Sequence, residues 1–157
     1  MSLEERFITS LNSASKSLQT ADHMIYITYP LIKDKKLLLK ILSELHIAVT
    51  SAVNAILQYE YYYKRIEIYS DPRSNFQEFR EKCAPRYKIT PEQVKSILEI
   101  IKIAESHKKS PFEFIKNDKI VIMSDNMQTE TLTLEKVKAF LVEVKDIIRK
   151  ASIIIKR

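Results

Sequence analysis

The chain of 157 residues has a formal net charge of +6, no glycine, no tryptophan and a single cysteine, Cys83. The absence of glycine excludes Gly-rich phosphate loops and dinucleotide fingerprints, because both bring a backbone without Cβ close to phosphate groups. A single cysteine excludes an internal disulfide framework and fits a reducing, cytoplasmic setting. The length fits one helical-bundle domain, residues 1–157, that can bury its own core.

The N-terminal residues carry Glu4 and Glu5 and no long apolar run, so the sequence predicts no signal peptide. No stretch of about 18 apolar residues lacks charges, which argues against a membrane-spanning helix. The 26 basic residues against 20 acidic ones allow contact with RNA or with an acidic protein. We therefore expect a cytoplasmic protein with no membrane partner.

The first expected helix covers residues 3–29. Ser2 and Glu5 match a capping box, in which each side chain accepts a backbone N–H of the first helical turn. Pro30 is expected to end the helix, because a proline disfavours helical geometry at the residue before it. Apolar residues recur every three or four positions, as one helical face requires: Leu3, Phe7, Leu11, Ala14, Leu18, Ala21 and Ile25.

A long central helix is expected from Asp34, as N-cap, to about Tyr69. Its apolar residues fill an arc of roughly 200°, which is wider than the stripe of an ordinary surface helix. Such a helix needs neighbours on two or three sides, so we expect the other helices to pack around it as an antiparallel bundle. The apolar positions are Leu38, Ile41, Leu42, Leu45, Ala48, Val49, Ala52, Val53, Ile56 and Leu57.

Two shorter helices are expected in the middle of the chain. Asp71 as N-cap and Pro72 at the first helical position introduce a helix over about 74–83. Thr90 and Gln93 form a second capping box and begin a helix over 91–106. The apolar face of the second helix is expected to contain Val94, Ile97, Leu98, Ile101 and Ala104.

The remaining segments complete the expected fold. Residues 110–116 repeat the capping pattern and predict one helical turn, and residues 119–132 predict a two-stranded β-ribbon that packs on the helices. Thr133 is expected to cap the last helix, whose apolar positions continue to Ile154. The predicted fold class is all-α, an antiparallel helical bundle built on the central helix 34–69, with a small β-ribbon near 119–132.

Four polar side chains are pocket candidates. Asp22 and His23 could supply a general base with an oriented imidazole. Neighbours in a helix point about 100° apart, however, which favours a polar helix end as the explanation of these residues. His46 and Asn54, with Thr50 between them, share a ledge that could floor a pocket, or could be hydrogen-bonded at a helix interface. No cysteine, and no carboxylate four residues after His46, completes a ligand pair, so we expect no metal and no cofactor.

A basic cluster lies at the end of the helix 91–106, where Lys102, His107, Lys108 and Lys109 gather. A phosphate could bind there by charge, and compensation of the helix dipole explains the same residues. The helical outline, with the spacings Lys102-x4-His107 and Lys40-x5-His46, resembles the HEPN superfamily. That resemblance implies RNA binding or metal-independent RNA cleavage by a dimer, with His107 and Lys102 as the catalytic candidates. Lysine stands here where the family has arginine, and lysine lacks the planar guanidinium fork.

The sequence thus combines a surplus of apolar helix surface with no converging catalytic set. We expect a non-enzymatic protein that acts by association, either with itself, as a dimer, or with a macromolecule. The expected contact surface is Tyr59, Tyr62, Tyr63, Lys64 and Arg65, because Tyr and Arg are typical interface anchors. The alternative is a HEPN-like RNA-binding or RNA-cleaving protein that uses the basic cluster, including Lys108 and Lys109.

Overall fold

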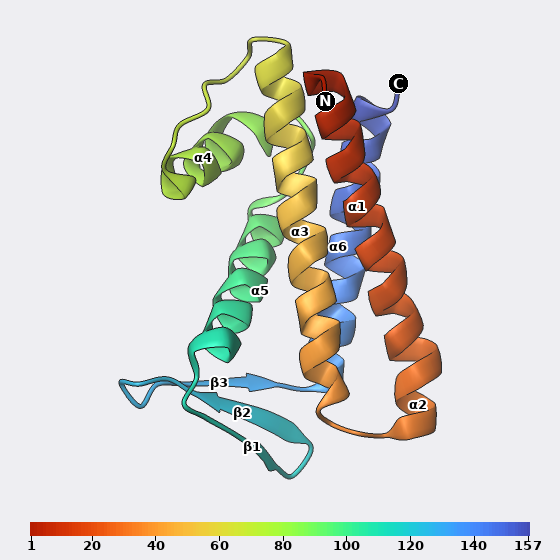
Figure 1. The fold of residues 1–157 in the computed structure, drawn as a ribbon, viewed down its shortest axis with the longest axis vertical. Coiled ribbons are helices and arrows are strands. Elements are labelled where there is room, and N and C mark those ends of the chain that lie inside the picture. Colours follow the sequence, from red (N-terminus) through yellow and green to blue (C-terminus); the bar gives the residue numbers. More distant parts are fainter.

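The computed structural model describes residues 1–157 and consists of long helices with a small antiparallel sheet at one end (Figure 1). This confirms the predicted fold class. The helices are α1 (Leu3–His23), α2 (Tyr29–Ile32), α3 (Leu37–Tyr62), α4 (Pro72–Glu78), α5 (Pro91–Lys109) and α6 (Leu134–Ile155). Two π-helical turns, η1 (Met24–Thr28) and η2 (Phe79–Cys83), and three strands, β1 (Phe112–Lys116), β2 (Lys119–Met123) and β3 (Thr129–Leu132), complete the chain.

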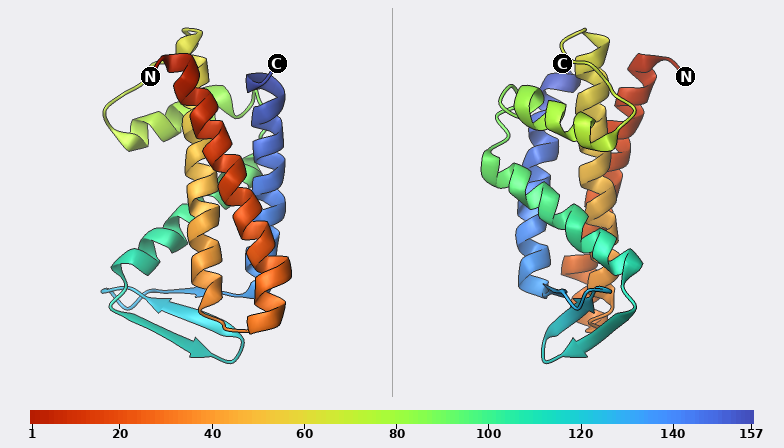
Figure 2. Two further views of the ribbon diagram at one scale, coloured as in Figure 1. Left: turned by 45° about the vertical axis from the view of Figure 1, so that its right-hand side comes forward. Right: turned by 90° about the vertical axis from the view of Figure 1, so that its left-hand side faces the viewer.

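Helix α3 is the centre of the core. Helices α1, α3 and α6 run side by side, and α5 crosses the bundle at an incline (Figure 2). All ten apolar positions predicted for the central helix are buried. By length and composition α3 could cross a membrane, contrary to the sequence-based expectation, but 44% of its most apolar window is buried inside the chain. It therefore packs as a core helix in this structure.

The prediction that the first helix ends at Pro30 is wrong. The chain passes from α1 through η1 into α2 and leaves the helix only at Lys33, which has a left-handed φ of 56°. Proline lacks an N–H and its ring clashes with the carbonyl four residues before it. A wide π turn directly before Pro30 changes the hydrogen-bonding interval, and this accommodates the proline within a continuing helix.

The central helix is shorter than predicted at both ends. The Asp34 carboxylate accepts the N–H of Lys36 at 3.0 Å, so it caps a turn that precedes the helix. At the other end Lys64 adopts a left-handed φ of 60°. The backbone N–H of Arg65 then donates to the carbonyl of Glu60 at 2.9 Å, which turns the chain back over the end of α3.

The caps of α1, α4, α5 and α6 are confirmed, whereas one position of the predicted α5 face is wrong. Leu98 is 41% exposed, while Ile100 and Ile103 are fully buried. Helix α5 is inclined across the bundle (Figure 2). Its buried residues Val94, Ile97, Ile100 and Ile103 recur every three positions, so the face that meets the core shifts along the helix. Leu98 is consequently left at the surface beside α4.

The predicted helical turn over 110–116 is also wrong, because this segment forms strand β1. The strand pairs antiparallel with β2, with Phe114 opposite Val121, and β2 pairs with β3, as the ribbon prediction required. The Ser110 hydroxyl, expected to cap a helix, donates to the carbonyl of Met123 at 2.6 Å instead. Asn117, with a φ of 58°, makes the tight turn between β1 and β2, a conformation that asparagine tolerates.

The burial of α3 gives a direct test of this fold. Leu45 on α3 is fully buried, and Leu45→Ala should lower the free energy of unfolding by about 2–5 kcal/mol, because it removes apolar contacts and leaves a cavity. The matched control is Val142→Ala on α6, since Val142 is 61% exposed and should change the value by less than about 0.5 kcal/mol. Chemical denaturation followed by circular dichroism measures both, and equal effects would contradict the assigned burial.

Candidate functional site

A buried carboxylate at the end of α3, that of Glu60, is surrounded by two cations and a tyrosine hydroxyl. Glu60 is 1% exposed, and its two oxygens accept from the Arg65 guanidinium at 3.1 and 2.9 Å. Arg86 Nε lies 3.1 Å from one oxygen, and the Tyr87 hydroxyl donates to the other at 3.3 Å. Glu60, Arg86 and Tyr87 were not predicted from the sequence as a cluster, although a single acidic residue within the apolar, tyrosine-rich end of a helix indicates a buried charge that needs partners.

The thiol of Cys83 is buried, and the Glu60 carboxylate acts on it as well. Burial raises the pKa of this thiol to about 12, and the nearby Glu60 carboxylate adds to the effect. Burial and Glu60 also raise the pKa of Tyr87. Since the thiolate is the reactive form of cysteine, Cys83 is held in its unreactive form. The cluster therefore stabilises the fold and provides no nucleophile.

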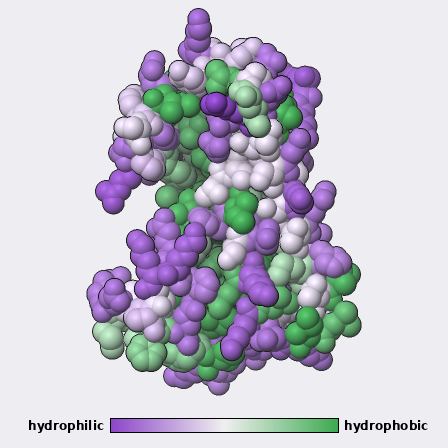
Figure 3. All heavy atoms as spheres, in the orientation of Figure 1, coloured by the Kyte–Doolittle hydropathy of each residue, from purple (hydrophilic) through white to green (hydrophobic).

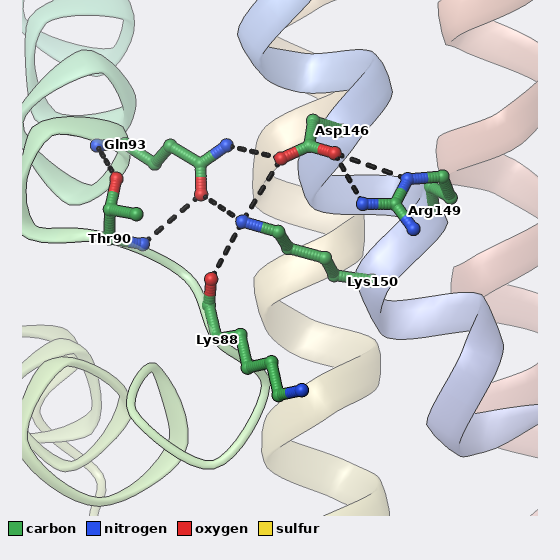
Figure 4. Close-up of polar contacts among 6 residues, drawn as sticks. All are labelled: Lys88, Thr90, Gln93, Asp146, Arg149 and Lys150. Atoms are coloured by element: carbon green, nitrogen blue, oxygen red, sulfur yellow. Dashed lines mark hydrogen bonds and ion pairs between the residues drawn. The ribbon is translucent and has the colours of Figure 1, made fainter.

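A second polar cluster joins the start of α5 to α6 (Figure 4). The Gln93 amide, buried in the capping box of α5, donates to Asp146 at 2.7 Å and accepts from Lys150 at 2.8 Å. Lys150 also donates to the carbonyl of Lys88 at 2.6 Å. The Arg149 guanidinium beside Asp146 holds the pKa of that carboxyl well below its usual range, with further contributions from Gln93 and Lys150. The Gln93 amide, the Arg149 guanidinium and the Lys150 ammonium group all donate to acceptors within the cluster. These hydrogen bonds join the start of α5 to α6.

The tyrosine-rich end of α3 is mostly engaged within the chain. Tyr59 and Tyr62 meet the ring of Phe7 edge-on, with centroid distances of 5.2 and 5.8 Å, and the Tyr62 hydroxyl donates to Glu4. The Arg65 guanidinium that binds Glu60 also lies 5.0 Å from the centre of the Tyr63 ring. Of the predicted contact residues, Tyr63, Lys64 and Arg65 are exposed, although the Arg65 guanidinium is bound to Glu60.

The structure does not bring the three histidines together. His23 is exposed, and its neighbour Asp22 binds Lys145 on α6 at 3.1 Å. His46 is half-buried under the end of α5, where burial, and then the charge of Lys108, lower its pKa. Asn54 donates to Ser10 on α1 at 3.3 Å, which is the interface role considered for this ledge.

Two residues of the basic cluster at the end of α5 contact carboxylates on two different strands. Lys102 lies 3.0 Å from Glu130 on β3, whereas His107 contacts Glu113 on β1. A polar hollow of about 390 Å³ beside them contains Lys102 and Lys109 but also Glu105 and Asp125. Both catalytic candidates thus have carboxylate partners on different strands, and no group of three or more His, Cys, Asp or Glu side chains could hold a metal ion.

Strand β1 offers the most exposed apolar surface of the sheet. It forms one edge of the three-stranded sheet, and all five of its residues are exposed, with Phe112 at 65% and Phe114 at 43%. On β2, Ile120 and Ile122 face the bundle and are buried. Phe112 and Phe114 pair with Met123 and Val121, so these four apolar side chains share the outer face of the sheet.

Comparisons with known proteins identify no relative: no family model, no curated protein and no solved structure matches this chain. Function must therefore be inferred from the surfaces described above.

The Glu60 cluster generates a test of stability. Arg65→Met removes two hydrogen bonds from a carboxylate that stays buried, so the free energy of unfolding should fall by about 1–3 kcal/mol. Arg6→Met is the control, because Arg6 is exposed and its side chain makes no hydrogen bond or ion pair. Equal stability of the two variants would mean that Arg86 and Tyr87 suffice to stabilise Glu60.

The Gln93 and Asp146 cluster generates a test of pH dependence. Because the folded state lowers the pKa of Asp146, its contribution to stability is present above the unfolded-state pKa of about 3.9 and is lost as the pH falls through the folded-state pKa. Asp146→Asn should therefore cost most near pH 6 and progressively less toward about pH 3. Denaturation curves of both proteins across this range measure the difference, and a constant difference would contradict the assignment.

Proposed function

We propose that this protein acts by association rather than by catalysis, and that its partner is a second copy of the chain joined through strand β1. The observation that carries the proposal is the free edge of β1, with all of its side chains exposed. An edge strand presents unpaired backbone N–H and C=O groups, which pair readily with another strand. Natural edges are usually blunted by charge or proline, but β1 carries three large apolar residues among its five.

The sequence of β1 fits pairing across a two-fold axis. An antiparallel alignment centred on Phe114 pairs all five residues: Phe114 faces its own copy, Phe112 faces Lys116, and Glu113 faces Ile115. No like charges stand opposite each other, and the central aromatic pair is favourable. Such an interface is isologous, because the same surface patch of each copy contacts the equivalent patch of the other. The two three-stranded sheets would then form one continuous sheet.

The surroundings of β1 add apolar surface to this interface. An antiparallel sheet with one face in water normally alternates apolar and polar residues, with the polar ones outward. Here Phe112, Phe114, Val121 and Met123 share the outer face. At the same end of the molecule, Leu31 on α2 is 81% exposed (Figure 1). Exposed apolar side chains gathered in this way are typical of an interaction site.

The absence of a converging catalytic set supports association over catalysis. The three histidines lie on different elements, α1, α3 and α5, and Cys83 is buried with a raised pKa. A catalytic group needs a base or a nucleophile within reach of a shared substrate position. The residues that the sequence suggested for cleavage, Lys102 and His107, are bound to separate carboxylates.

Light scattering during size-exclusion chromatography tests the proposal. The wild-type protein should have twice the chain mass of 18.4 kDa, and Phe114→Lys should have the single mass, because two lysines would face each other across the axis. Phe112→Lys, at a more exposed position, gives a second disrupting variant that places lysine opposite Lys116. Val142→Lys on α6 is the matched control, since Val142 is 61% exposed and lies outside the sheet.

Two outcomes would contradict this interface. A wild-type protein that elutes only as a monomer would exclude self-association under the conditions used. A dimer that persists in both phenylalanine variants, with unchanged circular dichroism, would place the interface elsewhere on the chain.

A further inference from the structure

A continuous groove runs between α4 with η2 on one side and α5 on the other. Both η2 and α5 pack against α3, and three hollows of about 680, 480 and 230 Å³ adjoin along their junction. The first and second hollows share Arg80 and Leu98, and the second and third share Phe76 and Ile101. Figure 3 shows this groove as a notch with apolar atoms inside, at the place of the gap between α4 and α5 in Figure 1.

The floor of the groove is an apolar stripe on α5 in which Leu98 is exposed, Ile101 is half-buried and Val94 is buried. On α5, Val94, Leu98 and Ile101 follow the spacing of one helical face. Leu98 is 41% exposed, although its periodicity places it with the core residues. Phe76 on α4 lines the opposite wall in two of the hollows. Two helical walls with an apolar floor make a site into which a third helix can pack.

The rim of the groove is basic and its cations have no partners in the chain. Arg73, Arg80 and Lys95 line the hollows, are exposed, and make no side-chain hydrogen bond or ion pair. Arg65, Arg86 and Arg149, elsewhere on the protein, are all bound to carboxylates. No Asp or Glu lines any of the three hollows. The groove is therefore apolar at its floor and positively charged at its edges.

We propose that this groove binds an acidic amphipathic α-helix of a partner protein. Apolar residues of such a helix, spaced at three and four positions, would pack on Leu98, Ile101 and Phe76, and its carboxylates would pair with the rim cations. The stripe from Val94 to Ile101 rises about 10 Å along α5, so two to three turns of a bound helix would cover it. This site is separate from strand β1 and does not depend on self-association.

Two other kinds of ligand fit the groove less well. Small-molecule sites enclose most of their ligand, whereas this groove is open along its length (Figure 3). Binding of single-stranded nucleic acid relies on several aromatic side chains for base stacking, and Phe76 is the only aromatic residue that lines the hollows. Single-stranded nucleic acid is nevertheless included in the test as a competing ligand.

The test uses two fluorescent peptides of about 14 residues with the same apolar face, one flanked by Glu and the other by Lys. Fluorescence anisotropy with the full-length wild-type chain should show the acidic peptide binding at least about tenfold more tightly than the basic one, because only the acidic peptide complements the rim. Its affinity should fall as salt concentration rises, since the rim charges are exposed.

Three protein variants separate the parts of the groove. Arg73→Glu with Arg80→Glu should reverse the preference and favour the basic peptide, a result that general loss of structure could not give. Leu98→Glu should weaken binding of the acidic peptide by at least about tenfold, because it places a charge in the apolar floor. Arg6→Glu is the control and should bind as the wild-type protein does, since Arg6 is exposed and lies on α1, outside the groove.

Several results would overturn the proposal. These are equal or absent binding of the two peptides, failure of the charge-reversed variant to change the preference, or tighter binding of a single-stranded oligouridine than of the acidic peptide. Loss of the dimer in Leu98→Glu, with its circular dichroism unchanged, would assign the groove to a second copy. The mass of Leu98→Glu is measured separately from peptide anisotropy. This outcome can therefore be distinguished from failure of the β1 interface, which the masses of the Phe112→Lys and Phe114→Lys variants test.

Discussion

Burial of the wide apolar face of α3 is the constraint on which the rest of this structure depends. The helix carries apolar residues over an arc too wide for one neighbour, so α1, α5 and α6 must each pack against part of it. α1 and α6 lie along the helix, whereas α5 crosses it at an incline (Figure 2). That incline carries Leu98 away from the core and opens the groove beside α4. The candidate binding surface is thus a direct result of how the core is covered.

The end of α3 is determined by charge as much as by packing. A carboxylate buried as deeply as Glu60 is costly unless several donors surround it. Arg65 reaches it only because the chain turns back after Tyr63, and Arg86 and Tyr87 reach it from the segment after η2. One buried side chain therefore holds three separate segments at the same end of the bundle. The aromatic rings around Arg65 pack over this arrangement from outside.

The sequence predicted local structure better than the relations between elements. The caps at Ser2, Asp71, Thr90 and Thr133 were recognisable because the chemistry of a helix start is local. The π turn that accommodates Pro30 and the strand β1 were not, since the first depends on a shifted hydrogen bond and the second on a partner strand.

The candidate sites show the same limit. The Glu60 cluster joins residues up to 27 positions apart, and the groove is formed by the angle between two helices, so neither has a spacing that can be read along the chain. The histidine and tyrosine patterns could be seen in the sequence. The contacts of Asp22 with Lys145 and of Tyr59 with Phe7 could not be predicted, because they join helices that are far apart in the sequence.

The turns at Lys33 and Lys64 have a consequence for the unfolded chain. Both residues adopt left-handed backbone angles where glycine is the usual choice, at a cost of about 1 kcal/mol or more each. At each position where a glycine could stand, a residue with a side chain has fewer conformations in the unfolded state. Less entropy is then lost on folding, which stabilises the folded state by about 0.4–1 kcal/mol per position. A chain without glycine thus has backbone strain at a few turns of its folded state. In return, its unfolded state has less conformational freedom along the whole chain.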